Sequence, residues 1–111
     1  MARTVVVGDI HGCYDELLAL VEGLGLGESD RLVAVGDLVT KGGKSREVLD
    51  LFIGDARFAA VIGNHDRALL EYWKGERRKK HLKPSQKRCA KELKEGRERY
   101  AEFFDSLPGY I

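Results

Sequence analysis

Short apolar runs alternate with amphipathic stretches over the first 73 residues of the chain. Three of these runs are typical of buried β-strands, because strands covered on both faces are apolar almost throughout. They lie at 4–7, 32–35 and 58–62. Each run is followed by a glycine that allows a sharp turn, at Gly8, Gly36 or Gly63. Strands that alternate with helices predict βαβ units and a parallel sheet, hence an α/β fold.

Between and after these runs, apolar positions recur with the spacing of one helical face. The predicted faces carry Leu17, Leu18, Val21 and Leu24, then Val48, Leu49 and Phe52, then Ala68, Leu69, Tyr72 and Trp73. Ser45 is the expected N-cap of the second helix. We expect the three strand-to-helix loops to meet at the carboxyl edge of the sheet, where open α/β sheets bind their ligands.

The character of the sequence changes at Lys74. A basic cluster covers 77–80, and one long helix is expected from about Gln86 to Leu107. Its expected docking residues are Phe103, Phe104 and Leu107. Pro108 and Gly109 then break the helix, and 110–111 suggest the start of another strand. We therefore expect a core at 1–73 and a basic helical cap or insertion at 74–111.

Charge is divided unevenly between these two segments. Residues 1–73 carry 7 basic and 12 acidic residues, a net charge of −5, whereas 74–111 carry 12 and 6, a net charge of +6. A basic segment suits an anionic partner such as a polyphosphate or RNA. This one lacks the interleaved aromatic residues that stack on single strands. A solvated cap that steers anionic substrates is therefore the favoured interpretation.

Several protein classes are excluded by composition. The hydrophobic share of 43% and charged share of 33% are typical of a globular domain. No apolar run approaches the roughly 20 residues that cross a membrane, and the N-terminus has no signal-peptide pattern. Cys13 and Cys89 form no CxxC pair, so neither a disulfide nor a zinc knuckle is expected. These features predict a cytoplasmic protein with reduced thiols and no membrane partner.

The loops after the three strands carry residue types that bind metals. They read GDIHG at 8–12, GDLVTKG at 36–42 and GNHD at 63–66. Asp9 and His11 offer one cation a carboxylate and an imidazole, a mixed set that suits Mn, Fe, Zn or Co rather than calcium. Asp37 has two oxygens that can bridge two cations, and Asn64 offers an amide oxygen to the second. Two such cations clamp an in-line displacement at phosphorus, and His65 is the candidate to protonate or stabilise the leaving oxygen.

Taken together, these motifs resemble the signature of calcineurin-like metallophosphoesterases. Within that superfamily they are similar to the branch of PPP-type serine/threonine phosphatases and symmetrical diadenosine tetraphosphate hydrolases. The resemblance covers about Thr4 to Trp73 and implies the N-terminal half of a four-layer α/β/β/α fold. It also implies two divalent metals, with Mn²⁺ expected and Fe, Zn, Co or Mg as alternatives. By this resemblance Asp9 and His11 bind the first metal, Asp37 bridges both, Asn64 binds the second, and His65 takes the general-acid position.

Two departures from the PPP-type pattern bear on the substrate. Thr40-Lys41 stands where those phosphatases have an Asp-Arg pair, so the aspartate that orients the catalytic histidine is absent. Lys41 meets a phosphate as a point charge, without arginine's bidentate fork. GNHD in place of GNHE also favours the bacterial diadenosine tetraphosphatase-like members. A nucleotide polyphosphate or another small phosphoester is therefore the expected substrate, contacted by Lys41 and Asn64, and a phosphoprotein is the alternative.

The histidine count suggests that the site is incomplete. The resemblance implies further histidine ligands from later loops, but the chain has only three histidines. The third, His81, lies beside the basic cluster, where a surface position is favoured over a ligand role. We expect a truncated domain, or a half-domain that self-association or a partner chain completes and that is inactive alone. Such a half would expose an apolar face of its sheet.

Four other residues near the motifs have competing interpretations. For Cys13, packing is favoured over a redox switch. Tyr72 and Trp73 are expected to pack in the core rather than stack on a nucleobase. Asp66 either orients His65 or caps the following helix, and the cap is favoured.

Overall fold

The computed structural model of the protein describes residues 2–109. Three parallel strands form one sheet in the order β1-β2-β3, with β1 at Thr4–Val7, β2 at Arg31–Ala34 and β3 at Phe58–Ala60. The helical elements are α1 (Tyr14–Leu24), α2 (Ser45–Gly54), α3 (Asn64–Trp73), the short 3-10 helix η1 (Lys79–His81), α4 (Pro84–Glu92) and α5 (Arg97–Ser106). The predicted α/β class and parallel sheet are confirmed. The strand expected at 110–111 lies outside the described residues.

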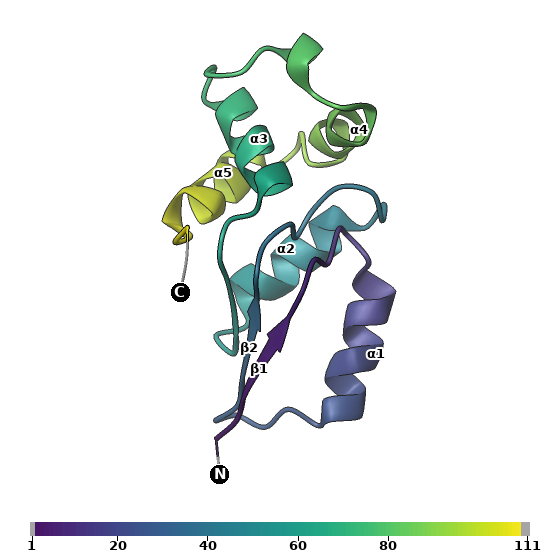
Figure 1. The fold of residues 1–111 in the computed structure, drawn as a ribbon, viewed down its shortest axis with the longest axis vertical. Coiled ribbons are helices and arrows are strands. Elements are labelled where there is room, and N and C mark those ends of the chain that lie inside the picture. Colours follow the sequence, from purple (N-terminus) through teal and green to yellow (C-terminus); the bar gives the residue numbers. More distant parts are fainter. Residues whose placement is uncertain (1, 110–111) are drawn as a thin grey trace.

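The helices divide into two groups around the sheet. Helix α1 runs beside the strands, whereas α3, α4 and α5 gather beyond their carboxyl ends (Figure 1). Helix α3 packs against both α4 and α5, and α4 also contacts α2. The molecule is consequently elongated, with extents of 47 × 24 × 21 Å. This arrangement places the C-terminal helices next to the edge from which the motif loops emerge. No helix within residues 2–109 is long and apolar enough to cross a membrane.

One continuous cluster of buried apolar side chains joins the sheet to the C-terminal helices. Its members from β2, α2 and the second motif loop include Leu32, Ala34, Leu38, Val48 and Leu49, and those from α4 and α5 include Cys89, Tyr100 and Phe104. Phe104 is fully buried, and Trp73 stacks on it with ring centroids 6.0 Å apart. The docking function of Phe104 and the packing interpretation of Trp73 are therefore confirmed. Burial of a side chain of this size stabilises the fold by roughly 1.5–3 kcal/mol.

Two expectations about the sheet and α1 are wrong. Cover on both faces does not extend to β1, where Val6 is 63% exposed, because nothing within residues 2–109 covers its outer side. Leu18 was assigned to the apolar face of α1, yet it is exposed while Leu17 is buried. Leu17 faces the core, whereas Leu18, about 100° further round the helix, lies outside the buried stripe.

The long helix expected from Gln86 to Leu107 is in fact two helices, α4 and α5. The break ends at Gly96, which adopts a left-handed conformation with φ of 85°. The guanidinium of Arg46 donates to the carbonyl oxygens of Glu92 and Glu95 at 2.9 and 2.7 Å, so α2 satisfies carbonyls that the interrupted helix leaves free. The turn lets Tyr100 enter the core, where its hydroxyl donates to Asp50.

Ser45 is the first residue of α2 and not its N-cap. Its hydroxyl accepts a hydrogen bond from the Thr40 amide at 3.0 Å. The side chain therefore supports the second motif loop, and the predicted cap is wrong.

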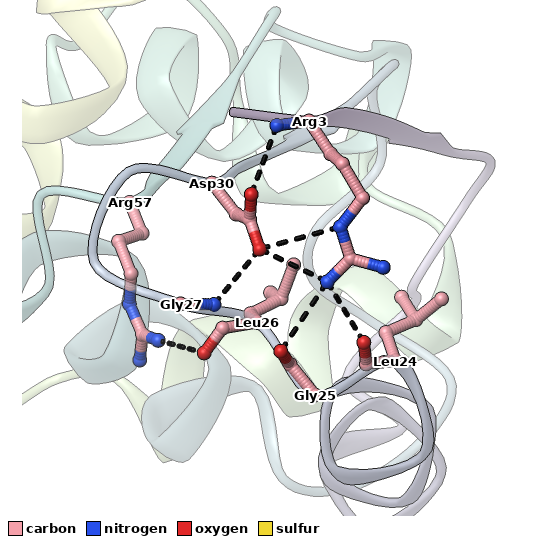
Figure 2. A network of polar contacts seen from close by, with 7 residues as sticks. All are labelled: Arg3, Leu24, Gly25, Leu26, Gly27, Asp30 and Arg57. Atoms are coloured by element: carbon pink, nitrogen blue, oxygen red, sulfur yellow. Dashed lines mark hydrogen bonds and ion pairs between the residues drawn. The ribbon is translucent and has the colours of Figure 1, made fainter. Parts of the chain in front are cut away.

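A polar network holds the opposite, amino edge of the sheet (Figure 2). The Asp30 carboxylate accepts from the backbone amides of Arg3 and Gly27 and from the Arg3 guanidinium, at 2.8–3.3 Å. Arg3 also donates to the carbonyl oxygen of Leu24 at the end of α1. Arg57, just before β3, donates to the carbonyl oxygen of Leu26 in the same loop. The bonds from the Arg3 side chain and from the two backbone amides hold the Asp30 pKa well below its usual range.

Candidate metal centre

The first two motif loops are joined by backbone hydrogen bonds. The amides of Ile10 and His11 both donate to the Asp37 carbonyl oxygen, at 3.1 and 2.8 Å. The Gly12 amide donates to Leu38, and the Gly42 amide returns to the His11 carbonyl oxygen at 2.6 Å. The loops therefore form one unit, and residues 26 to 31 positions apart keep fixed relative positions.

Four non-glycine residues in these loops have left-handed backbone conformations. They are His11, Asp37, Thr40 and Lys41, with φ values of 50°, 47°, 74° and 58°. Each such residue costs of order 1 kcal/mol or more, and the cost is greatest for a β-branched residue such as Thr40. Conformations of this kind persist where surrounding hydrogen bonds enforce them, and they cluster at functional sites. These are the only positive-φ non-glycine residues among those described.

Asp9, His11 and Asp37 come together at the centre of these loops. Each offers one ligand atom, and the three atoms lie within 4.8 Å of one another. Two atoms bound at about 2.1 Å to one tetrahedral cation are about 3.4 Å apart, so the side chains would close by up to about 1.4 Å to coordinate one cation together. His11 Nε2 lies 3.5 Å from Asp9 Oδ2. The buried Nδ1 of His11 has no hydrogen-bond partner within residues 2–109. A nitrogen and two carboxylates in this arrangement fit a divalent transition metal.

The third motif loop packs directly on Asp37. The His65 amide donates to Asp37 Oδ1 at 2.9 Å. Gly63 lies so close that a Cβ on it would overlap the Asp37 backbone nitrogen and carboxylate. Glycine is therefore required here for steric reasons, independently of its backbone angles.

Asp66 joins the second and third loops from inside the protein. Its fully buried carboxylate accepts from the amides of Leu38, Val39 and Gly63 at 3.0–3.3 Å. Because Gly63 is the N-cap of α3, the expected cap is confirmed. The bonds to Leu38 and Val39, just after Asp37, were not foreseen. Burial raises the pKa of Asp66 to about 6, although the three amides oppose that shift.

The His65 ring lies between the metal-ligand cluster and helix α4. It meets the His11 ring edge to face, with centroids 5.4 Å apart. The His65 ring also contacts α4, where the side-chain amide nitrogen of Gln86 lies 3.1 Å from His65 Nδ1. Burial lowers the pKa of His65, and the Asp37 carboxylate opposes this. Sequence reasoning missed Gln86. The Pro84–Gln86 pattern signals a helix start, but no local signal points to His65.

The remaining candidates lie around this centre. Asn64 is the exposed first residue of α3, and Lys41 is exposed on the second loop, close enough for its charge to lower the His65 pKa. His81 is exposed in η1 and is not part of the Asp-His-Asp cluster. The ligand role of Asn64 and the phosphate contacts of Lys41 and Asn64 stay predictions.

A basic cavity of about 610 Å³ lies among η1, α3, α4 and the start of α5. Its lining includes Tyr72, Trp73 and six basic residues, Lys79, Lys87, Arg88, Lys91, Lys94 and Arg97. None of these six forms an ion pair with an acidic side chain in the part of the chain that the structure describes. Arg88 also lines a smaller cavity of about 120 Å³ beside Thr40 and Lys41. Arg88 therefore lies between the second motif loop and the basic cavity.

Comparison with known proteins agrees with this geometry. Residues 2–111 match the family model described as calcineurin-like phosphoesterase. A symmetrical bis(5'-nucleosyl)-tetraphosphatase of Salmonella arizonae is 44% identical over 80 residues, which are 69% of this chain and 28% of that protein. The chain thus spans well under half the length of this relative.

Solved structures show the same fold. One described as a "putative diadenosine tetraphosphatase" superposes with a TM-score of 0.74 and 36% identity, over 95% of this chain and 42% of that one. A serine/threonine phosphatase from Saccharomyces cerevisiae superposes with a TM-score of 0.61 over 97% of this chain and 36% of that one. Its identity is 22%, so this second likeness concerns the fold alone.

Proposed function

The chain belongs to the calcineurin-like phosphoesterase family, and we propose that it carries the metal-binding half of a hydrolase for nucleoside polyphosphates such as diadenosine tetraphosphate. The observation that supports this most is the convergence of Asp9, His11 and Asp37 within 4.8 Å, beside His65. The tetraphosphatase relatives support the substrate class. We also propose a cytoplasmic location, from the sequence pattern alone.

The proposed metal site uses four residues. Asp9 and His11 would hold one divalent ion, Asp37 would contact both ions, and Asn64 would hold the second. Mn²⁺ is the proposed metal, with Fe, Zn, Co or Mg as alternatives for this ligand set. When bound, two such ions supply an activated water and neutralise charge on the phosphoryl group.

The chain's own residues orient the substrate in this proposal. Lys41 and Asn64 contact the phosphoryl oxygens, and His65 protonates or stabilises the leaving oxygen. Arg88 and the basic cavity attract the rest of the polyphosphate, because six cations there have no acidic partner among residues 2–109. Thr40-Lys41 in place of an Asp-Arg pair makes a phosphoprotein the less favoured substrate.

The test is hydrolysis of diadenosine tetraphosphate by the 111-residue chain with Mn²⁺, measured by release of ADP. We expect that turnover, by the chain itself or by an assembly of chains that completes the site, is abolished by EDTA and lowered at least about 100-fold by Asp37→Asn, since the site loses its shared carboxylate. Asp15→Asn is the matched control, because Asp15 is an exposed acid paired with Lys44. Wild-type turnover in Asp37→Asn would refute the bridging role. Preference for a phosphopeptide would point to a protein phosphatase.

Native mass spectrometry measures the metal content and the number of chains in the species that is tested for hydrolysis. A two-metal species, as a monomer or as a complex of chains, supports the proposal. A stable metal-free monomer without turnover would show a half-domain that depends on a partner or on further residues for its site.

A further inference from the structure

The side-chain amide of Gln86 connects the start of helix α4 to the ring of His65. Its Oε1 accepts from the Lys83 backbone amide at 2.8 Å, and its Nε2 lies 3.1 Å from His65 Nδ1. Gln86 is only 6% exposed, and it occupies the third position of α4, after Pro84 at the helix start. The helix geometry therefore fixes where this amide sits.

The orientation of the amide follows from its two partners. A backbone N–H only donates, so the Gln86 atom that faces Lys83 is the carbonyl oxygen. The NH₂ group must then face His65, and because it too only donates, His65 Nδ1 is the acceptor. A neutral imidazole that accepts at Nδ1 carries its hydrogen on Nε2.

We infer that Gln86 is a positioning residue for His65, which it holds in the tautomer with hydrogen on Nε2. A carboxylate in the same place would accept from Nδ1–H and select the opposite tautomer. The amide instead leaves the second nitrogen of the ring as a hydrogen-bond donor. Such a donor suits a phosphoryl or leaving oxygen, and this last step alone rests on the proposed function. The positioning device comes from the segment that follows the motifs, 21 residues beyond His65.

The tautomer can be measured without metal or substrate. Nitrogen-15 correlation spectra of the imidazole groups distinguish Nε2–H from Nδ1–H, and only three histidines contribute. The metal-free chain is recorded near pH 8.5, well above the ordinary histidine pKa of about 6.5. His65→Asn identifies the His65 signals. We expect hydrogen on Nε2 alone, and hydrogen on Nδ1 in the wild-type chain would overturn the inference.

Gln86→Glu reverses the polarity of this contact with little other change. Glutamate keeps an oxygen for the Lys83 amide but replaces the donor that faces His65 by an acceptor. We expect the His65 hydrogen to move to Nδ1 in this variant. Arg31→Gln is the control, since Arg31 is exposed at the start of β2, away from the site, and its replacement changes the net charge by the same −1. An unchanged tautomer in a folded Gln86→Glu chain would overturn the inference, and if that chain does not fold, the wild-type spectrum decides.

Turnover gives a second, separable readout. In the Mn²⁺-loaded chain, Gln86→Glu should lower kcat by roughly 3–10-fold with KM unchanged, the effect of misdirecting one hydrogen bond in the transition state. Arg31→Gln should leave kcat unchanged. If the expected tautomers are found but no variant, including wild type, hydrolyses any phosphoester, the proposed function fails and the positioning of His65 stands. If turnover is normal and the tautomer is Nδ1–H, the reverse holds.

Discussion

Replacing Asp66 by alanine should destabilise the fold by about 3–5 kcal/mol, although this residue is not a proposed ligand or catalytic group. The fully buried carboxylate accepts from three backbone amides, those of Leu38, Val39 and Gly63. A buried amide that loses its acceptor costs roughly 1–3 kcal/mol. Three such losses are not additive, because water entering the vacated space can satisfy some of the amides.

Asparagine at the same position gives a sharper test. Its oxygen can replace Oδ1 and keep the amides of Leu38 and Val39, but its NH₂ group then faces the Gly63 amide, donor against donor. We therefore expect Asp66→Asn to cost about 1–3 kcal/mol, clearly less than Asp66→Ala. Native-state hydrogen exchange should show the loss at Gly63 in the asparagine variant and at all three amides in the alanine variant.

Urea unfolding followed by the fluorescence of Trp73, the only tryptophan, measures these differences. The measurement belongs near pH 8, where the Asp66 carboxyl group, with its pKa raised to about 6, is ionised. Asp105→Asn is the control, because Asp105 forms an exposed ion pair with Lys74 that should contribute less than about 1 kcal/mol. If Asp66→Ala costs no more than this control, the amide contacts do not hold the two loops together.

Three further changes test other parts of the structure. Gly63→Ala should destabilise the fold and lower the Mn²⁺ affinity measured by calorimetry at least about tenfold, because the added Cβ overlaps Asp37. Gly54→Ala is the control, because the space around Gly54 is open and the change should be close to neutral or stabilising. The lowered pKa of Asp30 adds stability that is fully present above the unfolded pKa of about 3.8 and is lost as pH falls through the folded pKa. Asp30→Asn should therefore remove the acid-dependent part of the stability measured by urea unfolding, and an unchanged pH profile would contradict this. Tripolyphosphate should change the fluorescence of Trp73 in a salt-dependent way, and Arg88→Gln should weaken this change. Arg31→Gln, at the amino edge of the sheet, should leave it unaltered, and equal effects of the two variants would show that the basic cavity does not bind the anion.

The sequence predicted well those features that depend on local pattern and parallel topology. Three apolar runs, each followed by a polar loop, give the strands and bring Asp9, His11 and Asp37 together, because parallel strands end at one edge. Their mutual distances depend on loop backbone that no local rule supplies. The left-handed conformation of Thr40, unfavourable for a β-branched residue, exists because neighbouring loops enforce it.

The sequence predicted less well where long-range contacts decide local structure. The region from Gln86 to Leu107 has helical character throughout, and its division depends on Gly96 together with Arg46, a residue of α2 that binds the freed carbonyl oxygens. Ser45 resembles a helix cap, yet its hydroxyl is used by the Thr40 amide. Gln86 meets His65 only through the packing of α4 against α3.

The network at the amino edge of the sheet also bears on the order in which the chain can assemble during synthesis. Its bonds join Arg3, Asp30 and Arg57, so a nascent chain needs no residue beyond the third strand to form it. By contrast, the partner of His65 belongs to α4, and Tyr100, which α2 contacts through Arg46, belongs to α5. Since chains fold from the N-terminus as they are made, the strands can be anchored while the carboxyl edge is still open. The histidine at the centre of the candidate site then acquires its fixed orientation only after α4 has been made.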